Sequence, residues 1–330
     1  MSVLSDRDGR GETAASVSAR PRRRRSRAGA GRAEPGLKRA HFVEPGIATL
    51  LLLPQLAILL LFFFIPSIRA LAQAFLLSDP FGNRVQLVWF DNFTALFRSP
   101  EYQDSVWVTI WFTLSQNVLT LAIAAVLAFA TDRVVRLRGT YKTILLLPYA
   151  IAPAIAGILW AFLFNPAVGP IAHMIKSLGF SWDPNLNAND ALLLVTFAAA
   201  WKHICYDYIF LVAALLALPQ SLLEAAAVDG AGPIRRFFKI ALPLIGPTIF
   251  FLVVMNFVYG FFDTFAIIDA VTRGGPAGAT NILVYKVYQD GFLNLDLGSS
   301  AAQSVILMLS AFALTLLQFR YVERKVNYDV

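Results

Sequence analysis

The sequence predicts an all-α membrane protein with six transmembrane helices and short cytoplasmic helices between two of them. Apolar residues make up 57% of the 330 residues and charged residues only 15%, whereas soluble domains average about 45–50% and about 25%. The apolar excess gathers in long runs that are nearly free of charge, as membrane spans require. Arg and Lys gather in alternate connecting segments, which is typical of multi-pass membrane proteins.

The chain begins with a basic tail, residues 1–45, in which eleven Arg or Lys residues stand against five acids. The tail contains the run Arg22–Arg25, is rich in Ala, Gly and Ser, and lacks apolar periodicity, so we expect it to be disordered. An Arg-rich segment just before a membrane span is typical of a cytoplasmic anchor. The alternative is an arm that binds nucleic acid, but we expect lipid and no nucleic acid among the partners.

Six apolar runs follow within residues 46–330. Each is long enough to cross roughly 30 Å of hydrocarbon at about 1.5 Å per residue. Prolines recur inside these runs, and each one removes a backbone donor and kinks its helix. This pattern is compatible with a transport pathway and equally with ordinary kinks in a packed bundle. The predicted spans are Ile47–Ala70, Val106–Ala130, Thr143–Phe164, Ala191–Leu218, Ile240–Phe262 and Ser299–Phe319.

The placement of Arg and Lys predicts the orientation, because cytoplasmic segments of membrane proteins carry the excess of positive charge. The tail, the segments after the second and fourth spans, and the C-terminus are basic. The other three connections carry more acids than bases. Both termini are therefore expected in the cytoplasm, with an even number of spans between them.

The cytoplasmic connection at residues 219–239 has a pattern of its own. Ser221 and Glu224 fit a capping box at the start of a short helix. Gly230 supplies a left-handed residue that ends this helix, and Pro233 suits the first turn of a second helix. A pair of short helices with small side chains and one projecting acid is an element that fits a groove on a partner.

A purely structural reading would leave Glu224 as a cap, but capping does not require the order of small residues that follows it. The pattern E-A-A-x-x-D-G-A, followed by F-x-K-I-x-L-P, resembles the EAA loop of bacterial ABC importer permeases. This resemblance implies coupling helices that insert into a cleft of a cytoplasmic ATPase, where Glu224 would pair with a basic residue. The residues expected to carry the coupling are Glu224, Ala225, Ala226, Asp229, Gly230, Ala231 and Phe237.

The resemblance covers most of the chain from about Ile47 onward. Over this length the sequence is similar to A-type permease subunits of sn-glycerol-3-phosphate importers, which belong to the larger family of MalF-like sugar permeases. The segments that carry this likeness are Leu145–Pro166, Phe261–Thr280, Ser299–Met308 and Gln318–Tyr328. The resemblance implies a type I ABC importer permease in the bacterial inner membrane, and sn-glycerol-3-phosphate or glycerophosphodiesters as cargo.

The implied partners are a second permease subunit, an ATPase dimer and an extracytoplasmic solute-binding protein. The sequence contains no G-x-x-x-x-G-K-[ST] phosphate loop. We therefore expect ATP to bind the partner ATPase, and we expect this chain to be no enzyme, with no catalytic residue, cofactor or metal of its own.

The Gly- and Pro-rich stretch Thr272–Thr280 is expected to be an outer turn, which the resemblance places near the docking face of the binding protein.

Polar side chains inside spans are candidates for the cargo pathway, because they are costly in a bilayer. Lys202 could attract a phosphate as a compact charge, or it could pair with Asp207 while the neighbouring aromatic rings only pack. His203 alone is more often a hydrogen-bonded core residue than a ligand. The candidate pathway residues are Lys202, His203, Tyr206, Asp207, Asn256, Tyr259 and Asp263.

Two other classes of membrane protein compete with an importer permease. A secondary transporter would couple its cargo to an ion through acids inside the membrane, but Asp207 is the only acid well inside a span and no inverted repeat is visible. A channel or a scaffold would explain the spans, but it leaves the pattern at residues 219–239 without a cause.

Overall fold

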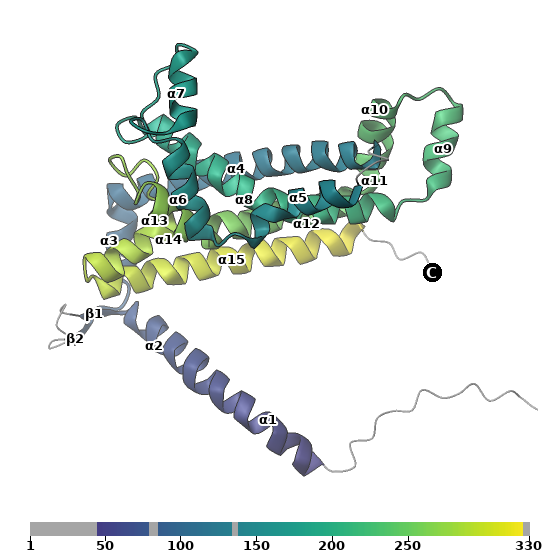
Figure 1. The fold of residues 1–330 in the computed structure, drawn as a ribbon. Coiled ribbons are helices and arrows are strands. Elements are labelled where there is room, and N and C mark those ends of the chain that lie inside the picture. The colour runs from purple at the N-terminus through teal and green to yellow at the C-terminus, as the bar shows by residue number, and fades with distance from the viewer. Residues whose placement is uncertain (1–44, 79–84, 134–137, 326–330) are drawn as a thin grey trace, which may run out of the picture. The chain divides into compact units, whose positions relative to one another are not determined.

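The computed structural model describes residues 45–78, 85–133 and 138–325, and most of these residues belong to helices (Figure 1). The predicted disordered tail, residues 1–45, lies outside the described residues except for Pro45. The chain divides after Leu56 into two compact units, and the helical bundle belongs to the second.

Within the described residues, five helical stretches are long and apolar enough to cross a membrane, and there are six when two half-helices that meet at a bend of 103° are counted as one span. The prediction of six spans is therefore confirmed. The stretches are Thr49–Gln73, Pro100–Thr131, Ala188–Leu216, Gly246–Asp263 and Leu297–Arg320, with the bent pair Thr143–Ala150 and Pro153–Leu163.

The spans are built from α-helices, two of which continue directly into short π-helical stretches (η). These elements are α1 (Pro45–Leu59), η1 (Leu60–Phe64), α2 (Ile65–Gln73), α4 (Pro100–Arg133), α5 (Arg138–Ala150), α6 (Pro153–Leu163), α8 (Ala188–Leu216), α12 (Gly246–Val258), η3 (Tyr259–Asp263) and α15 (Leu297–Lys325).

Shorter elements connect the spans. They are strands β1 (Leu76–Ser78) and β2 (Val85–Leu87), helices α3 (Asp91–Arg98), α7 (Pro170–Ser177), α9 (Gln220–Val228), α10 (Pro233–Arg236), α11 (Leu242–Leu244), α13 (Phe265–Val271) and α14 (Leu283–Tyr288), and the π-helical stretches η2 (Phe237–Ala241) and η4 (Gln289–Leu293). The two strands pair antiparallel, with Leu76 opposite Leu87.

The third span is not the single helix that was predicted over Thr143–Phe164. It breaks between α5 and α6, and the bend of 103° follows from Pro153. A proline disfavours the helical region for the residue before it, and Ala152 accordingly has φ −59° and ψ 140°. Pro153 itself suits the first position of α6, because no helical partner is needed there.

The fifth span begins at Gly246 rather than at the predicted Ile240. The short helix α11 ends at Leu244, and the next residue, Ile245, leaves the helical geometry with φ −88° and ψ 14°. Pro247 has no N–H to donate to the carbonyl of Pro243 four residues earlier, so the hydrogen-bond ladder is interrupted at this point.

The core of the second unit lies between α4, α8 and α13. Phe112, Val195, Ile267 and Ile268 are fully buried there, together with the small residue Ala199. Small side chains let membrane helices approach closely. This packing holds the middle of α8, which carries most of the candidate pathway residues, in a fixed position beside α4 and α12 (Figure 1).

The two ends of this unit differ in charge. α9 and α10 lie at the end where α4 finishes, α5 begins and α15 finishes, whereas α3, α7, α13 and α14 lie at the opposite end (Figure 1). Arg133, Arg138, Arg235 and Arg320 therefore belong to the same end. Within this unit, the fold brings together the described parts of three segments that the sequence analysis assigned to the cytoplasm: the flanks of the second and third spans, α9 with α10, and the end of α15.

Candidate functional site

The segment predicted to contact an ATPase forms α9, a tight turn and α10. Gly230 has a φ of +77°. Its N–H donates to the Ala227 carbonyl at 3.1 Å, and the N–H of Ala231 donates to the Ala226 carbonyl at 2.9 Å. This pair of bonds is the Schellman arrangement that ends a helix, and Pro233 takes the first position of α10. Both predictions for this turn are confirmed.

The predicted capping box at Ser221 and Glu224 is wrong. The N-cap of α9 is Pro219, and no side chain caps the helix. Pro219, with φ −59° and ψ 119°, already turns the chain out of α8. Ser221 is therefore the second residue of the helix. From this position its hydroxyl cannot accept the backbone N–H groups that an N-cap side chain accepts. Glu224 is consequently not used as part of a cap.

α9 presents its side chains outward, and none of its residues is buried. Glu224, Ala225, Asp229 and Gly230 are exposed, while Ala226 and Ala231 are half-buried. Arg236 of α10 donates a hydrogen bond from Nη1 to the Leu223 carbonyl at 3.2 Å, which ties the two helices together. The sequence analysis missed this role of Arg236, because nothing in the pattern pairs an arginine with a distant carbonyl. The result is an exposed surface in which two carboxylates, Glu224 and Asp229, stand among mostly small side chains.

Phe237 differs from the other predicted coupling residues because it points into the protein. Its side chain is only 7% exposed, and its ring centroid lies 4.8 Å from that of Phe129 on α4. Phe237 therefore anchors the segment to the second span. The six other predicted residues stay at or near the surface.

A buried polar network joins three spans at the candidate pathway. Asn256 on α12 donates from Nδ2 to Asp207 Oδ2 at 2.7 Å, and Gln116 on α4 donates from Nε2 to Asn256 Oδ1 at 3.1 Å. All three side chains are fully buried. Gln116 was not among the predicted site residues, although a glutamine inside an apolar run could have signalled it. These hydrogen bonds hold α4, α8 and α12 together.

Three aromatic side chains form a stack beside the network. The His203 ring lies 3.9 Å from that of Tyr259 and 5.0 Å from that of Tyr206. The Tyr259 hydroxyl donates to the Ala199 carbonyl at 3.3 Å. His203 and Tyr206 are only half-buried, so this stack reaches the edge of the bundle. The network of Asp207, Asn256 and Gln116 stays fully buried. Asp263 is exposed one helical turn beyond Tyr259.

Lys202 and Asp207 do not pair with each other. The Lys202 ammonium donates to the Tyr149 carbonyl at 2.9 Å and lies 5.1 Å from the centroid of the Tyr149 ring. Lys202 and Asp207 of α8 thus bond to different neighbours, Asp207 to Asn256 on the fifth span and Lys202 to Tyr149 on the third. The alternative of an internal Lys202–Asp207 ion pair is therefore wrong.

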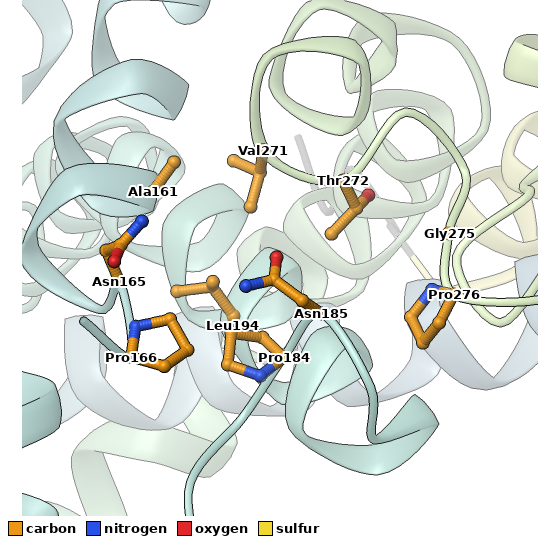
Figure 2. A pocket seen from close by; sticks show the side chains of 10 residues that line it. All are labelled: Ala161, Asn165, Pro166, Pro184, Asn185, Leu194, Val271, Thr272, Gly275 and Pro276. Carbon is orange, nitrogen blue, oxygen red and sulfur yellow. The ribbon is translucent and has the colours of Figure 1, made fainter.

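A cavity of about 220 Å³ (Figure 2) lies beside α6 and α13, at the opposite end of the unit from α9 (Figure 1). The Asn165 amide oxygen accepts the N–H groups of Ala167 and Val168 at 2.9 and 3.3 Å, which orients this amide beside the cavity. The Asn185 amide also lies at this cavity (Figure 2). Its lining residues are Ala161, Asn165, Pro166, Pro184, Asn185, Leu194, Val271, Thr272, Gly275 and Pro276. The cavity can hold a small group that accepts hydrogen bonds.

Residues 109–328 match the family described as binding-protein-dependent transport system inner membrane component. The chain belongs to this family. It is accordingly a multi-pass inner-membrane permease component, which confirms the permease class that the EAA pattern predicted. Secondary transporters, channels and scaffolds are thereby set aside.

Two curated relatives share about half of their residues with this chain. One is the sn-glycerol-3-phosphate transport system permease protein UgpA of Rhizobium meliloti (strain 1021), 52% identical over 292 residues, which are 88% of this chain and 100% of that protein. The other is the protein of the same name from Escherichia coli O157:H7, 52% identical over 280 residues, covering 85% and 95% of the two chains.

A solved structure with the same fold belongs to a bacterial ABC transporter involved in the import of the acidic polysaccharide alginate. Its chain is 22% identical and superposes with a TM-score of 0.73 over 86% of this chain and 96% of that one. The predicted fold of a type I importer permease is therefore confirmed.

Proposed function

We propose that this chain is a permease subunit of an ATP-driven importer whose cargo is sn-glycerol-3-phosphate or a glycerophosphodiester. The observation that carries the cargo assignment is the identity of 52% with the UgpA permease of Rhizobium meliloti over the whole of that protein. The partners that follow are a second permease subunit, an ATPase dimer that binds the ATP, and an extracytoplasmic solute-binding protein.

We propose further that α9 and the turn at Gly230 dock on the ATPase. The support is structural: the helix has no buried residue, yet its turn is closed by two backbone hydrogen bonds. A preformed and exposed helix end loses little freedom when a partner binds it. Glu224 projects from this surface as a carboxylate without a capping role, which leaves it available for a basic side chain of the ATPase.

The proposed orientation places the end with α9 and α10 in the cytoplasm, together with both chain termini. The gathering of Arg133, Arg138, Arg235 and Arg320 at this end supports it, because cytoplasmic segments carry the positive excess. The cavity beside Thr272 then lies on the outer side, where the solute-binding protein delivers cargo.

We propose that the cargo pathway follows the edge of the bundle marked by the half-buried residues His203 and Tyr206. Tyr259 backs this edge, and Asp263 extends it outward. Asp207 and Asn256 contribute by holding the helices that form the pathway, since both side chains are fully buried. Lys202 lies on the same helix, and its contact is with the third span.

The test of coupling is Glu224→Ala in the complete importer reconstituted in proteoliposomes, with Ser221→Ala as a matched control on the same exposed helix. Glu224→Ala should leave the permease in the membrane, but it should weaken ATPase copurification and uptake of radiolabelled sn-glycerol-3-phosphate. Ser221→Ala should change neither, because its hydroxyl makes no cap. Wild-type copurification and wild-type uptake with Glu224→Ala would refute the docking surface.

The cargo assignment has its own test in the same proteoliposomes. Unlabelled sn-glycerol-3-phosphate should compete with the labelled compound, and maltose should not. Competition by maltose alone would refute the assignment without affecting the conclusion that the chain is an importer permease.

A further inference from the structure

The break in the third span leaves backbone carbonyls without helical partners. The carbonyl of Tyr149 would normally accept the N–H of the residue four positions later. That residue is Pro153, which has no N–H. An unsatisfied carbonyl is costly inside a bilayer, so a broken helix persists there only where other groups replace the missing donor.

Lys202 supplies this donor from another span. Its ammonium lies 2.9 Å from the Tyr149 carbonyl oxygen, and its side chain is only 8% exposed. The positive charge stands at the C-terminal end of α5, where the helix dipole favours a cation. The Tyr149 ring, with its centroid 5.1 Å from Nζ, adds a cation–π contact.

The other charged groups near this site do not compete for the ammonium. Asp207 accepts its hydrogen bond from Asn256 on the fifth span. Among the described residues, the ion pairs within 4.0 Å involve Lys286 and not Lys202. The contact that holds Lys202 in place is therefore the one to the Tyr149 carbonyl.

We infer that Lys202 is a positioning residue that stands in for the N–H missing at Pro153 and thereby fixes the bend between α5 and α6. α6 packs against α13, where a Cβ on Gly157 would lie 2.8 Å from that of Ala270. This contact therefore tolerates little displacement. The bend sets how α6 meets α13, so Lys202 acts on transport through the geometry of the third span and makes no contact with the cargo.

The test measures the bend directly. Spin labels are attached at Ile144→Cys of α5 and Ile158→Cys of α6 in the complete importer in nanodiscs. Pulsed electron paramagnetic resonance then reports the distance between the two labels across the bend. Both positions are exposed, at 63% and 61%. The native thiol of Cys205 is fully buried, so we expect it to take up no label, and a sample with this cysteine alone checks that.

Lys202→Met, which removes the donor and keeps much of the volume, should shift or broaden this distance. Uptake should show a maximal rate lowered about tenfold, the size expected for a buried acceptor left without its partner, with KM for sn-glycerol-3-phosphate within about twofold of wild type. Lys176→Met is the matched control, since Lys176 also donates to a carbonyl, that of Pro166, at 2.9 Å but on the surface. It should change neither the distance nor the rate.

A double-mutant cycle separates the carbonyl from other roles of the lysine. Pro153→Ala restores an N–H at this position and lifts the restriction on Ala152, so Lys202→Met should add little further change of distance in its background. Lys202→Arg retains a donor and should keep the wild-type distance, which covers the case that Lys202→Met fails to assemble.

An unchanged distance in Lys202→Met would overturn the inference. A KM raised tenfold or more at an unchanged distance would also overturn it, because it would assign the ammonium to the cargo. The distance is measured without cargo, so this test does not depend on which cargo the importer takes.

Discussion

Replacing Gly230 by Ala isolates the backbone turn of the proposed ATPase surface. The φ of +77° is left-handed, and a Cβ at this position would meet no atom within 4 Å. Crowding by neighbours therefore contributes nothing, and the cost is conformational alone. A residue with a Cβ in the left-handed region is disfavoured by roughly 1–2 kcal/mol.

Gly232→Ala is the matched control, only two residues away. Gly232 has φ −62° and ψ 160°, which alanine adopts freely, and its Cβ would also meet nothing within 4 Å. Gly-to-Ala exchange at such a position stabilises by about 0.4–1 kcal/mol, because the unfolded chain loses freedom. The two variants should therefore differ by roughly 1.5–3 kcal/mol, with opposite signs relative to wild type.

The consequence should appear in ATPase binding. α9 has no buried residue to hold it in place if its end is distorted, and a short helix is marginal without such support. A penalty of one to two kcal/mol corresponds to a factor of about 5–30 in an equilibrium. Titration of the ATPase onto permease complexes in nanodiscs should show a weakening of this size for Gly230→Ala and none for Gly232→Ala. Equal binding by the two variants would refute the role given to the left-handed turn.

Two further predictions concern the bundle. Asn256→Leu removes the donor to the buried Asp207 carboxylate and should lower the free energy of unfolding by about 1–3 kcal/mol or more; a melting temperature of the purified complex equal to wild type would contradict this. Gly260→Ala would place its Cβ 2.7 Å from Thr113 Cγ2 and should cost about 1–3 kcal/mol by overpacking. Adding Thr113→Ala to Gly260→Ala should restore part of that loss. A double variant that melts no higher than Gly260→Ala alone would contradict the overpacking.

The residues of the coupling segment show where sequence reasoning succeeds. A left-handed glycine followed by a proline three residues later fixes a local turn, so Gly230 and Pro233 were predicted correctly. The capping box failed because Pro219 starts the helix before Ser221 is reached. Phe237 belongs to the same pattern as the exposed residues, and only its contact with Phe129 shows that it anchors the segment.

The pathway residues show where sequence reasoning stops. The polarity of Lys202, Asp207 and Asn256 inside apolar runs was visible in the sequence, and their importance followed from the cost of polar groups in a bilayer. Their partners were not visible. Gln116 lies 140 positions from Asn256, and Lys202 lies 53 positions from Tyr149.

The sequence by itself determined that the chain is an all-α membrane protein, the number of its spans and the form of the Gly230 turn. These depend on properties that each short segment carries alone: apolar length and the backbone limits of glycine and proline. The tertiary structure decided that the third span breaks at Pro153 with Lys202 as the replacement donor, and that Asp207 bonds to Asn256 instead of Lys202. A hydrogen bond between spans depends on which faces of two helices meet, and that is settled only when the whole bundle packs.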